Sequence, residues 1–295
     1  MSFTIAYSID DALTALAAGA RPVAGGSDLV VGARHGKAPL PADLVAIDRL
    51  DELCCLEITD EGACIGSGVN HHTIERHAVL STQYAALADG SALVGSPSTR
   101  NVGTLGGNVM NASPAMDTGS PLVVLGADVE LRSLRGTRRV GVAELWTGPG
   151  RTSAEPDELC VAIHVPAPAA RSNSAYLRLE YRRSMEIAVV GAAASITLDG
   201  NGGVIAVRVA LTAVAPTIIE ITGLAGGSVA DVAAAAQSAA ADQARPISDV
   251  RASDAYRRHT VGVMARRAVE AAARRAAGET VSVPVNRAIG IGAAS

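Results

Sequence analysis

Two glycine-rich stretches contain the residues whose types and spacing could bind a phosphate-bearing ligand. "VAGGSDL" covers residues 23–29, and "GTLGGN" covers residues 103–108. A diphosphate needs several converging donors with no side chains in the way, and glycine permits both close backbone approach and positive φ. Either stretch alone also fits an ordinary loop. Because both follow apolar segments and carry Ser, Thr or Asn beside the glycines, together they predict two loops that close on one cofactor.

Neither stretch matches the common phosphate-binding fingerprints. The dinucleotide pattern GxGxxG is missing from both, and so is the P-loop pattern with its lysine. A Rossmann fold and a P-loop fold therefore have no support. The predicted cofactor site must be built on another architecture.

The cysteines and histidines form no pattern for a metal site. The four cysteines make no CxxC pair, and a histidine pair with a third histidine five residues on lacks supporting acids or cysteines. We therefore expect idle thiols, no disulfide and no metal ligand. The residues concerned are Cys54, Cys55, Cys64, Cys160, His71, His72 and His77.

Length and composition indicate a globular protein of two domains. The chain has 295 residues, of which 48% are hydrophobic and 18% charged, and its net charge of −4 argues against a nucleic-acid partner. No stretch approaches the roughly 20 apolar residues needed to span a bilayer, and the amino terminus has no basic leader. We expect a cytoplasmic protein with no membrane span.

The predicted elements place both glycine stretches in the first domain. A capped helix and a short strand precede residues 23–29, and a helical stretch precedes residues 103–108. Further on, alternation around Arg135 and Gly136 predicts a hairpin, and a strand ending in prolines marks a domain boundary near residue 168. The ranges expected are helix 72–88, hairpin 123–140 and strand 158–168.

The second domain is predicted to be α+β. Its first part indicates strands and a turn, with a helix possible at residues 185–194. Two alanine-rich segments, residues 228–244 and 253–278, predict helices. A loosely held tail, residues 286–295, follows.

With the elements in place, the motifs resemble those of a known family. They are "AGGSDLVVGARHG", "TRNVGTLGGNVMNASPAMD", "DELCVAIHVP", "YLRLEYRRSMEIAVVGAA" and "SDAYRRHTVGVMARRAVEAA". In this order and spacing they resemble the FAD-binding medium subunits of the molybdenum hydroxylases, the xanthine dehydrogenase and carbon monoxide dehydrogenase group. The form "GGSDL" with "NASPAMD" looks closer to the xanthine dehydrogenase side.

The resemblance implies an α+β fold with defined domains. Residues 1–168 would form a two-subdomain FAD-binding domain of the vanillyl-alcohol-oxidase (PCMH) type. Residues 169–285 would form a smaller α+β domain like the C-terminal domain of the carbon monoxide dehydrogenase flavoprotein, followed by the tail at 286–295.

By the same resemblance, the two loops hold the FAD pyrophosphate. Asp117 would reach the ribose or sugar-alcohol hydroxyls, Leu159 or Cys160 would line the flavin pocket, and Tyr176 and Arg178 would lie near the flavin ring. The loop residues implied are Val23, Ala24, Gly25, Gly26, Ser27, Asp28 and Leu29 in the first loop, and Val102, Gly103, Thr104, Gly106, Gly107 and Asn108 in the second.

The chain departs from the family pattern at three positions. Val94 stands where xanthine dehydrogenases often have an aromatic, Arg178 where a lysine is common, and Glu186 where an aspartate is usual, whereas Arg182 matches. The loss of the aromatic at 94 makes Tyr176 the aromatic neighbour expected for the flavin.

The resemblance also implies the function and the partners. FAD would receive electrons from 2Fe-2S clusters in a small subunit, and the substrate would be oxidised at a molybdenum-pterin cofactor in a large subunit. The assembly implied is a dimer of such heterotrimers. No catalytic residue is expected in this chain beyond the flavin. Two alternatives stay open: a stand-alone FAD oxidoreductase related to the cell-wall precursor reductase, and a flavin-free interaction module. The substrate pocket would lie in another chain.

Overall fold

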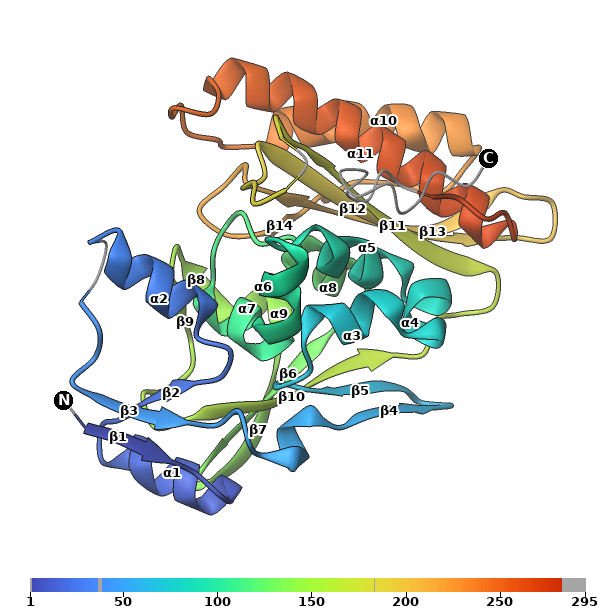
Figure 1. Ribbon diagram of the computed structural model, residues 1–295. Coiled ribbons are helices and arrows are strands. Elements are labelled where there is room, and N and C mark those ends of the chain that lie inside the picture. Colours follow the sequence, from blue (N-terminus) through green and yellow to red (C-terminus); the bar gives the residue numbers. More distant parts are fainter. Residues whose placement is uncertain (1, 37–38, 183, 283–295) are drawn as a thin grey trace.

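The computed structural model describes residues 2–36, 39–182 and 184–282, so the expected tail lies outside the described residues. The chain begins with a small subdomain built on a parallel sheet in the order β1–β3–β2 (Figure 1). Ser8 caps the helix α1, and the apolar face of that helix packs under the sheet. The elements are β1 (Ser2–Ile5), α1 (Ile9–Ala17), β2 (Arg21–Val23), α2 (Ser27–Arg34) and β3 (Asp43–Ala46).

A second subdomain is built on an antiparallel sheet in the order β4–β5–β10–β6–β7. Short helices cover one face of this sheet and bury the largest core cluster of the described residues (Figure 1). The strands are β4 (Leu56–Thr59), β5 (Gly62–Gly66), β6 (Asp128–Ser133), β7 (Gly136–Gly141) and β10 (Leu159–Pro166). The helices are α3 (His71–Arg76), α4 (Ala78–Gln83), α5 (Ala85–Leu93), α6 (Pro97–Val102), α7 (Leu105–Asn111), α8 (Gly119–Val124) and α9 (Val142–Leu145); η1 (Asp51–Cys54), β8 (Trp146–Gly148) and β9 (Arg151–Thr152) complete it.

The C-terminal domain is an antiparallel sheet in the order β11–β12–β13–β14, with α10 and α11 on its outer face (Figure 1). Its inner face rests on α5 and α8 of the first domain. Alanines such as Ala265, Ala268 and Ala272 are fully buried along α11, which lets that helix lie close to the sheet. The elements are β11 (Ser172–Leu179), β12 (Val190–Leu198), β13 (Val204–Thr212), β14 (Ile219–Glu220), α10 (Val229–Gln243) and α11 (Asp254–Ala276).

Most predicted elements are confirmed, and three are corrected. The stretch predicted to be helical at residues 72–88 is divided into α3, α4 and α5, with breaks at His77 and Tyr84. The alanine-rich helices, the strand before the prolines and the turn at Arg135 and Gly136 are present, but residues 123–127 belong to α8 and the loop after it, not to the hairpin. The helix considered at residues 185–194 is wrong, because β12 begins at Val190 and pairs on both sides with β11 and β13. Pairing and burial outweigh the helix propensity of its alanines.

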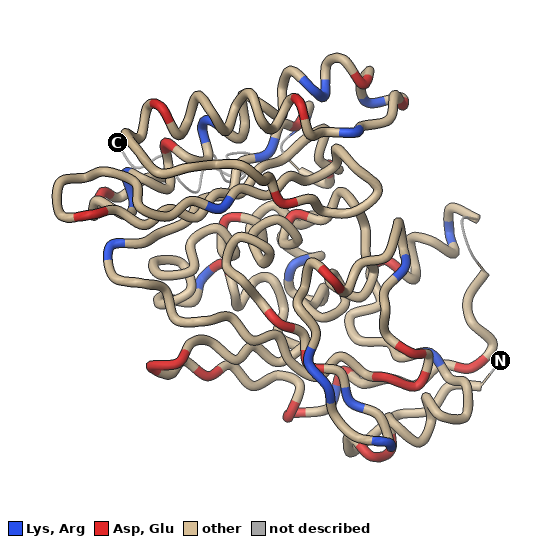
Figure 2. Tube along the Cα trace, turned by 180° about the vertical axis from the view of Figure 1, so that it is seen from behind, with Lys and Arg blue, Asp and Glu red and all other residues tan. Residues whose placement is uncertain are grey.

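Lys and Arg alternate with Asp and Glu over both domains (Figure 2). Many of them form ion pairs, such as Arg138 with Glu158 and Arg208 with Glu220. Within the described part of the chain, none of the helices combines the length and the apolar character that crossing a membrane requires.

Candidate cofactor site

The first glycine loop, residues 24–29, turns sharply from β2 into α2. Gly26 precedes the helix with φ of +66°, a left-handed conformation that favours glycine. Gly25 lies against the second loop so closely that a Cβ built on it would be 1.7 Å from the carbonyl oxygen of Val102. Among the described residues, the backbone N–H groups of residues 25–29 have no acceptor. These donors, at the positive end of the α2 dipole, are therefore available to an anion.

The second glycine loop, residues 103–108, runs into α7 and is bonded to the segment after β5. Leu105 donates its N–H to the carbonyl of Val69 at 2.9 Å, and Gly106 donates to the carbonyl of Ser67 at 2.9 Å. The N–H of Gly107 donates to Thr104 Oγ1 at 3.0 Å, which caps α7. Most donors of this loop are thus used within the protein.

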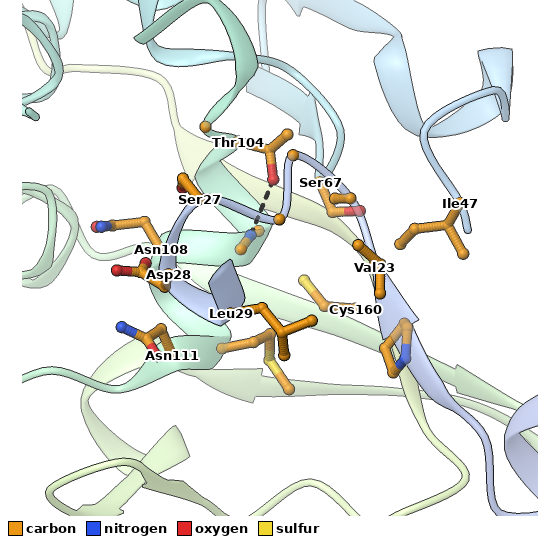
Figure 3. Close-up of a pocket in the computed structure, with 18 of the residues that line it drawn as sticks. Val23, Ser27, Asp28, Leu29, Ile47, Ser67, Thr104, Asn108, Asn111 and Cys160 are labelled. Atoms are coloured by element: carbon orange, nitrogen blue, oxygen red, sulfur yellow. Dashed lines mark hydrogen bonds between the residues drawn. The ribbon is translucent and has the colours of Figure 1, made fainter. Parts of the chain in front are cut away.

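Both loops face one open pocket between the two subdomains of the first domain. The pocket encloses about 1040 Å³ when the solvent at its mouth is counted. In Figure 3 the polar side chains of Asp28, Asn108 and Asn111 lie on one side of it, and the apolar Val23 and Ile47 lie towards the other. The lining residues are Arg21, Pro22, Val23, Ala24, Gly25, Gly26, Ser27, Asp28, Leu29, Ile47, Ser67, His71, Val94, Gly103, Thr104, Gly106, Gly107, Asn108, Met110, Asn111, Glu158, Leu159 and Cys160.

Burial shifts the pKa of three groups in the pocket wall. It lowers the pKa of His71 to about 4, helped by the charge of Arg100, so this imidazole is neutral at pH 7. Burial raises the pKa of the Cys160 thiol to about 12, with a further contribution from Glu130, and it also raises the pKa of Asp28. The wall therefore carries an unreactive thiol and an uncharged imidazole.

Thirteen of the seventeen residues expected at the site line the pocket. They are Val23, Ala24, Gly25, Gly26, Ser27, Asp28, Leu29, Gly103, Thr104, Gly106, Gly107, Asn108 and Leu159. The other four, Val102, Asp117, Tyr176 and Arg178, do not line it. Val102 contributes its carbonyl to the contact with Gly25, while its side chain is half exposed.

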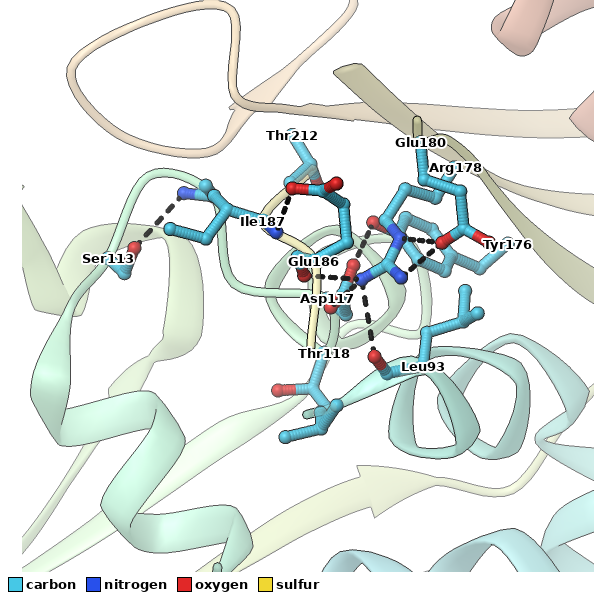
Figure 4. Close-up of polar contacts among 12 residues, drawn as sticks. Leu93, Ser113, Asp117, Thr118, Tyr176, Arg178, Glu180, Glu186, Ile187 and Thr212 are labelled. Carbon is cyan, nitrogen blue, oxygen red and sulfur yellow. Dashed lines mark hydrogen bonds and ion pairs between the residues drawn. The ribbon is translucent and has the colours of Figure 1, made fainter. Parts of the chain in front are cut away.

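Asp117, Tyr176 and Arg178 form a buried polar group, here called the Asp117 cluster (Figure 4). Tyr176 is fully buried and donates its O–H to Asp117 Oδ1 at 2.8 Å, while Arg178 Nη1 lies 2.7 Å from Asp117 Oδ2. Burial raises the pKa of Asp117 to about 6, although Arg178 and Tyr176 both act to lower it. Direct contact of these three side chains with a cofactor stays a prediction.

Several lining residues were not found from the sequence. Ser67 and His71 come from the segment after β5, Ile47 follows β3, and Met110 and Asn111 end α7. Met110 and Asn111 lie close to the second loop in sequence, in the same helix, whereas Ser67, His71 and Ile47 reach the pocket only through tertiary contacts. Ser67 Oγ and His71 Nδ1 are buried without a hydrogen-bond partner among the described residues.

The pocket fits a phosphate-bearing dinucleotide. The free N–H groups of the first loop suit a diphosphate, and a Cβ at Gly107 would meet only Thr104 Oγ1, at 3.0 Å, so the surface over that residue is otherwise open. Asp28 offers a carboxylate to a sugar hydroxyl, and Pro22, Ile47 and Leu159 offer apolar surface to a ring. The two orphaned polar atoms in the wall are also consistent with a bound polar ligand.

Comparison with known proteins gives two family matches. Residues 1–168 match the model of the FAD binding domain in molybdopterin dehydrogenase, and residues 175–272 match the CO dehydrogenase flavoprotein C-terminal domain. The chain is 31% identical to a putative xanthine dehydrogenase FAD-binding subunit of Escherichia coli strain K12, over 94% of this chain and 98% of the relative.

Carbon monoxide dehydrogenases are similar in sequence and in structure. The chain is 33% identical to the carbon monoxide dehydrogenase medium chain of Afipia carboxidovorans, over 91% of this chain and 95% of the relative. A solved carbon monoxide dehydrogenase from Hydrogenophaga pseudoflava superposes with a TM-score of 0.88 at 27% identity, covering 93% of this chain and 98% of that one. The two sequence identities do not separate a xanthine branch from a carbon monoxide branch.

Proposed function

This chain belongs to the FAD-binding subunits of the molybdopterin dehydrogenases, and from that membership we propose how it holds FAD and what it does with it. Its family is one of flavoprotein oxidoreductases. The proposed role is to take electrons from a cluster-bearing partner and pass them to an external acceptor. The flavin, when bound, supplies the exchange between single-electron and two-electron transfer. The protein supplies binding, orientation and electrostatics.

The pocket carries the proposal for FAD binding. We place the pyrophosphate on the free N–H groups of residues 25–29, with the second loop opposite, because those donors converge without intervening side chains. Thr104 and Asn108 add side-chain donors from the second loop. Asp28 accepts from a sugar hydroxyl, which suits a carboxylate better than contact with a phosphate.

The binding is proposed to be non-covalent. Cys160 and His71 line the pocket, but the Cys160 pKa of about 12 keeps the thiol protonated and a poor nucleophile. Acid precipitation of the purified protein should release free FAD into the supernatant. Yellow colour retained in the pellet would contradict the non-covalent part.

The subunit is proposed to act only in a complex. The relative from Afipia carboxidovorans is named a medium chain, which is an argument for large and small partner subunits. For this chain we propose a molybdenum-binding large subunit, a 2Fe-2S small subunit and a dimer of these heterotrimers. The described residues contain no group of His, Cys, Asp and Glu suited to a metal ion. We propose that the electrons come from the cluster-bearing partner. Function in the cytoplasm stays a prediction.

Reconstitution tests this proposal against the stand-alone oxidoreductase, which the family matches do not favour. The isolated subunit should bind FAD yet leave the flavin oxidised when purines, aldehydes, N-heterocycles or carbon monoxide are added. Activity should appear on mixing with the two partners. Substrate-dependent flavin reduction by the isolated chain, without molybdenum or iron, would overturn the proposed role. A purified chain that retains no visible flavin absorption after incubation with FAD and removal of the unbound FAD would instead support the flavin-free module.

A further inference from the structure

We propose that His71 is a further binding residue of the cofactor pocket, whose imidazole donates a hydrogen bond to the pyrophosphate of FAD. This role rests on the proposed function and deepens it. It adds a side-chain donor from a third segment, the one after β5, to the backbone donors of the first glycine loop.

The side chain of His71 is enclosed in the pocket wall without a hydrogen-bond partner. It is 1% exposed and lines the pocket. Nδ1 is buried with no partner among the described residues, and no hydrogen bond contributes to the pKa of the imidazole, which burial and Arg100 lower to about 4. The ring is therefore neutral at pH 7 and has one N–H to donate. A buried donor without an acceptor costs free energy, which a ligand that accepts would remove.

Backbone contacts hold His71 against the second glycine loop. Its N–H donates to the carbonyl of Gly103 at 3.1 Å, and the preceding residue, Asn70, forms an isolated β-bridge with Thr104. Asn70 also caps α3, because its Oδ1 accepts from the N–H of Thr73 at 2.8 Å. The place of the imidazole is thus fixed before any ligand binds.

The imidazole also lies close to the first glycine loop. A Cβ built on Gly103 would be 3.5 Å from His71 Cδ2 and 3.6 Å from Ser27 Oγ, so both side chains flank that glycine. Ser27 begins α2 and belongs to the stretch 25–29, whose N–H groups have no acceptor among the described residues (Figure 3). His71 therefore stands beside the donors on which we place the pyrophosphate.

The charge near His71 favours an anion over a sugar or a ring. Arg100 is 4% exposed, and it is the charged group that acts on the pKa of His71. Glu75 pairs with Arg100 at 3.1 Å but does not contribute to that pKa, which indicates a positive potential at the imidazole. Phosphate oxygens only accept hydrogen bonds, and they carry the opposite charge. A diphosphate satisfies both conditions.

The test measures the Kd of the apo-protein for FAD, for ADP and, by competition with FAD, for adenosine. ADP carries the diphosphate, and adenosine does not. His71→Phe keeps a ring and removes the donor, so FAD and ADP should bind about tenfold more weakly, as expected for the loss of one hydrogen bond to a charged group. The Kd of adenosine should not change. His71→Gln keeps a donor and should stay within about threefold of the wild type for all three probes.

The stability of the apo-protein should change in the opposite direction to the affinity. His71→Phe removes a buried polar group that has no partner, so the melting temperature of the apo-protein should rise by about 2 °C. A merely structural histidine would lose stability and affinity together. If His71→Phe does not fold, His71→Leu takes its place, because it also lacks a donor and has no ring to accommodate.

The adjacent His72 is the matched control. Its side chain is 37% exposed, bonds to Glu75 at 3.0 Å and does not line the pocket. His72→Phe should change the Kd of FAD and of ADP by less than about twofold. Equal losses of affinity in His71→Phe and His72→Phe would overturn the inference in favour of a general disturbance of α3.

The remaining outcomes separate the alternatives. Unchanged Kd values for FAD and ADP in His71→Phe would show that the imidazole does not bind the cofactor. Weaker FAD with unchanged ADP would assign His71 to the flavin half, and an equal loss for adenosine would assign it to the nucleoside; either result overturns the inference. A wild-type chain that binds neither FAD nor ADP would overturn the proposed function itself, whereas normal wild-type binding with unaffected His71 variants would overturn only the role of His71.

Discussion

The two glycine loops are similar in sequence and opposite in how they use their backbone. In the first loop, residues 25–29 keep their N–H groups free, and the following helix α2 has no buried residue. In the second loop, Leu105 and Gly106 donate to Val69 and Ser67, and both residues are buried. Glycine therefore exposes donors in one loop and permits close packing of two backbones in the other.

This difference shows that a glycine pair in a loop can serve either ligand binding or backbone packing. A Cβ on Gly106 would lie 2.4 Å from Ser67 Cβ, so that glycine is needed for packing with or without a ligand. A Cβ on Gly107 meets only Thr104 Oγ1 at 3.0 Å. Adjacent glycines of one motif thus have separate roles, and substitutions at each should separate affinity from stability.

The largest effect is expected for Gly25→Ala. The new methyl group would clash with the Val102 carbonyl and push the two loops apart, so FAD affinity should fall about a hundredfold. The melting temperature of the apo-protein should change little, because α2 buries no residue. Gly32→Ala, in the same helix with nothing within 4 Å, is the control and should keep full affinity in a fluorescence titration. Normal FAD binding by Gly25→Ala would show that the loops need not touch.

A smaller effect, on stability, is expected for Gly106→Ala. Overpacking against Ser67 should cost about 2 kcal/mol of unfolding free energy in the apo-protein, measured by denaturant unfolding. Gly107→Ala should cost less than about 1 kcal/mol, because only a hydroxyl must move. If the two variants are equally stable, the assignment of Gly106 to packing is wrong.

Thr104, the cap of α7, should contribute about 1 kcal/mol to the unfolding free energy of the apo-protein. Thr104→Ala removes the oxygen that accepts from the N–H of Gly107, so the apo-protein should lose about that amount of stability. Thr104→Ser keeps the acceptor and should retain most of it. The first loop has no side-chain cap, so Ser27→Ala should leave the stability of the apo-protein nearly unchanged. Equal losses in Thr104→Ala and Ser27→Ala would remove the contrast between the loops.

The smallest effect is a pH dependence of the stability of the apo-protein, caused by Asp117 behind the second loop. The folded pKa of Asp117 is raised to about 6, so its stabilising contribution is fully present below the unfolded pKa and is lost as pH rises through 6. From pH 7 to pH 5.5 the apo-protein should gain about 0.8 kcal/mol relative to Asp117→Asn. The charged or titratable groups that bear on Asp117 are Arg178, Tyr176 and Glu180. Parallel stability curves for the two proteins would show that Asp117 does not titrate in this range.

Much of the candidate pocket was predictable because glycine-rich loops are recognisable as short motifs in the sequence. The glycines, Thr104 and Asn108 stand in short motifs, and thirteen of the seventeen expected residues line the pocket. Ser67, His71 and Ile47 were missed because each reaches the pocket through strand order, which no local pattern records. The helix considered at residues 185–194 failed for a related reason, since partners on both sides make β12 a strand.

By itself, the sequence determined the positions of the turns, the two alanine-rich helices, the domain order and the family. Those features depend on local backbone preference and on short motifs that keep their order. Only the tertiary structure decided which glycine exposes donors and which is packed, because that depends on the distance from Gly25 to Val102 and from Gly106 to Ser67. It also placed Asp117, Tyr176 and Arg178 behind the pocket wall, where burial and pairing across two domains determine their chemistry.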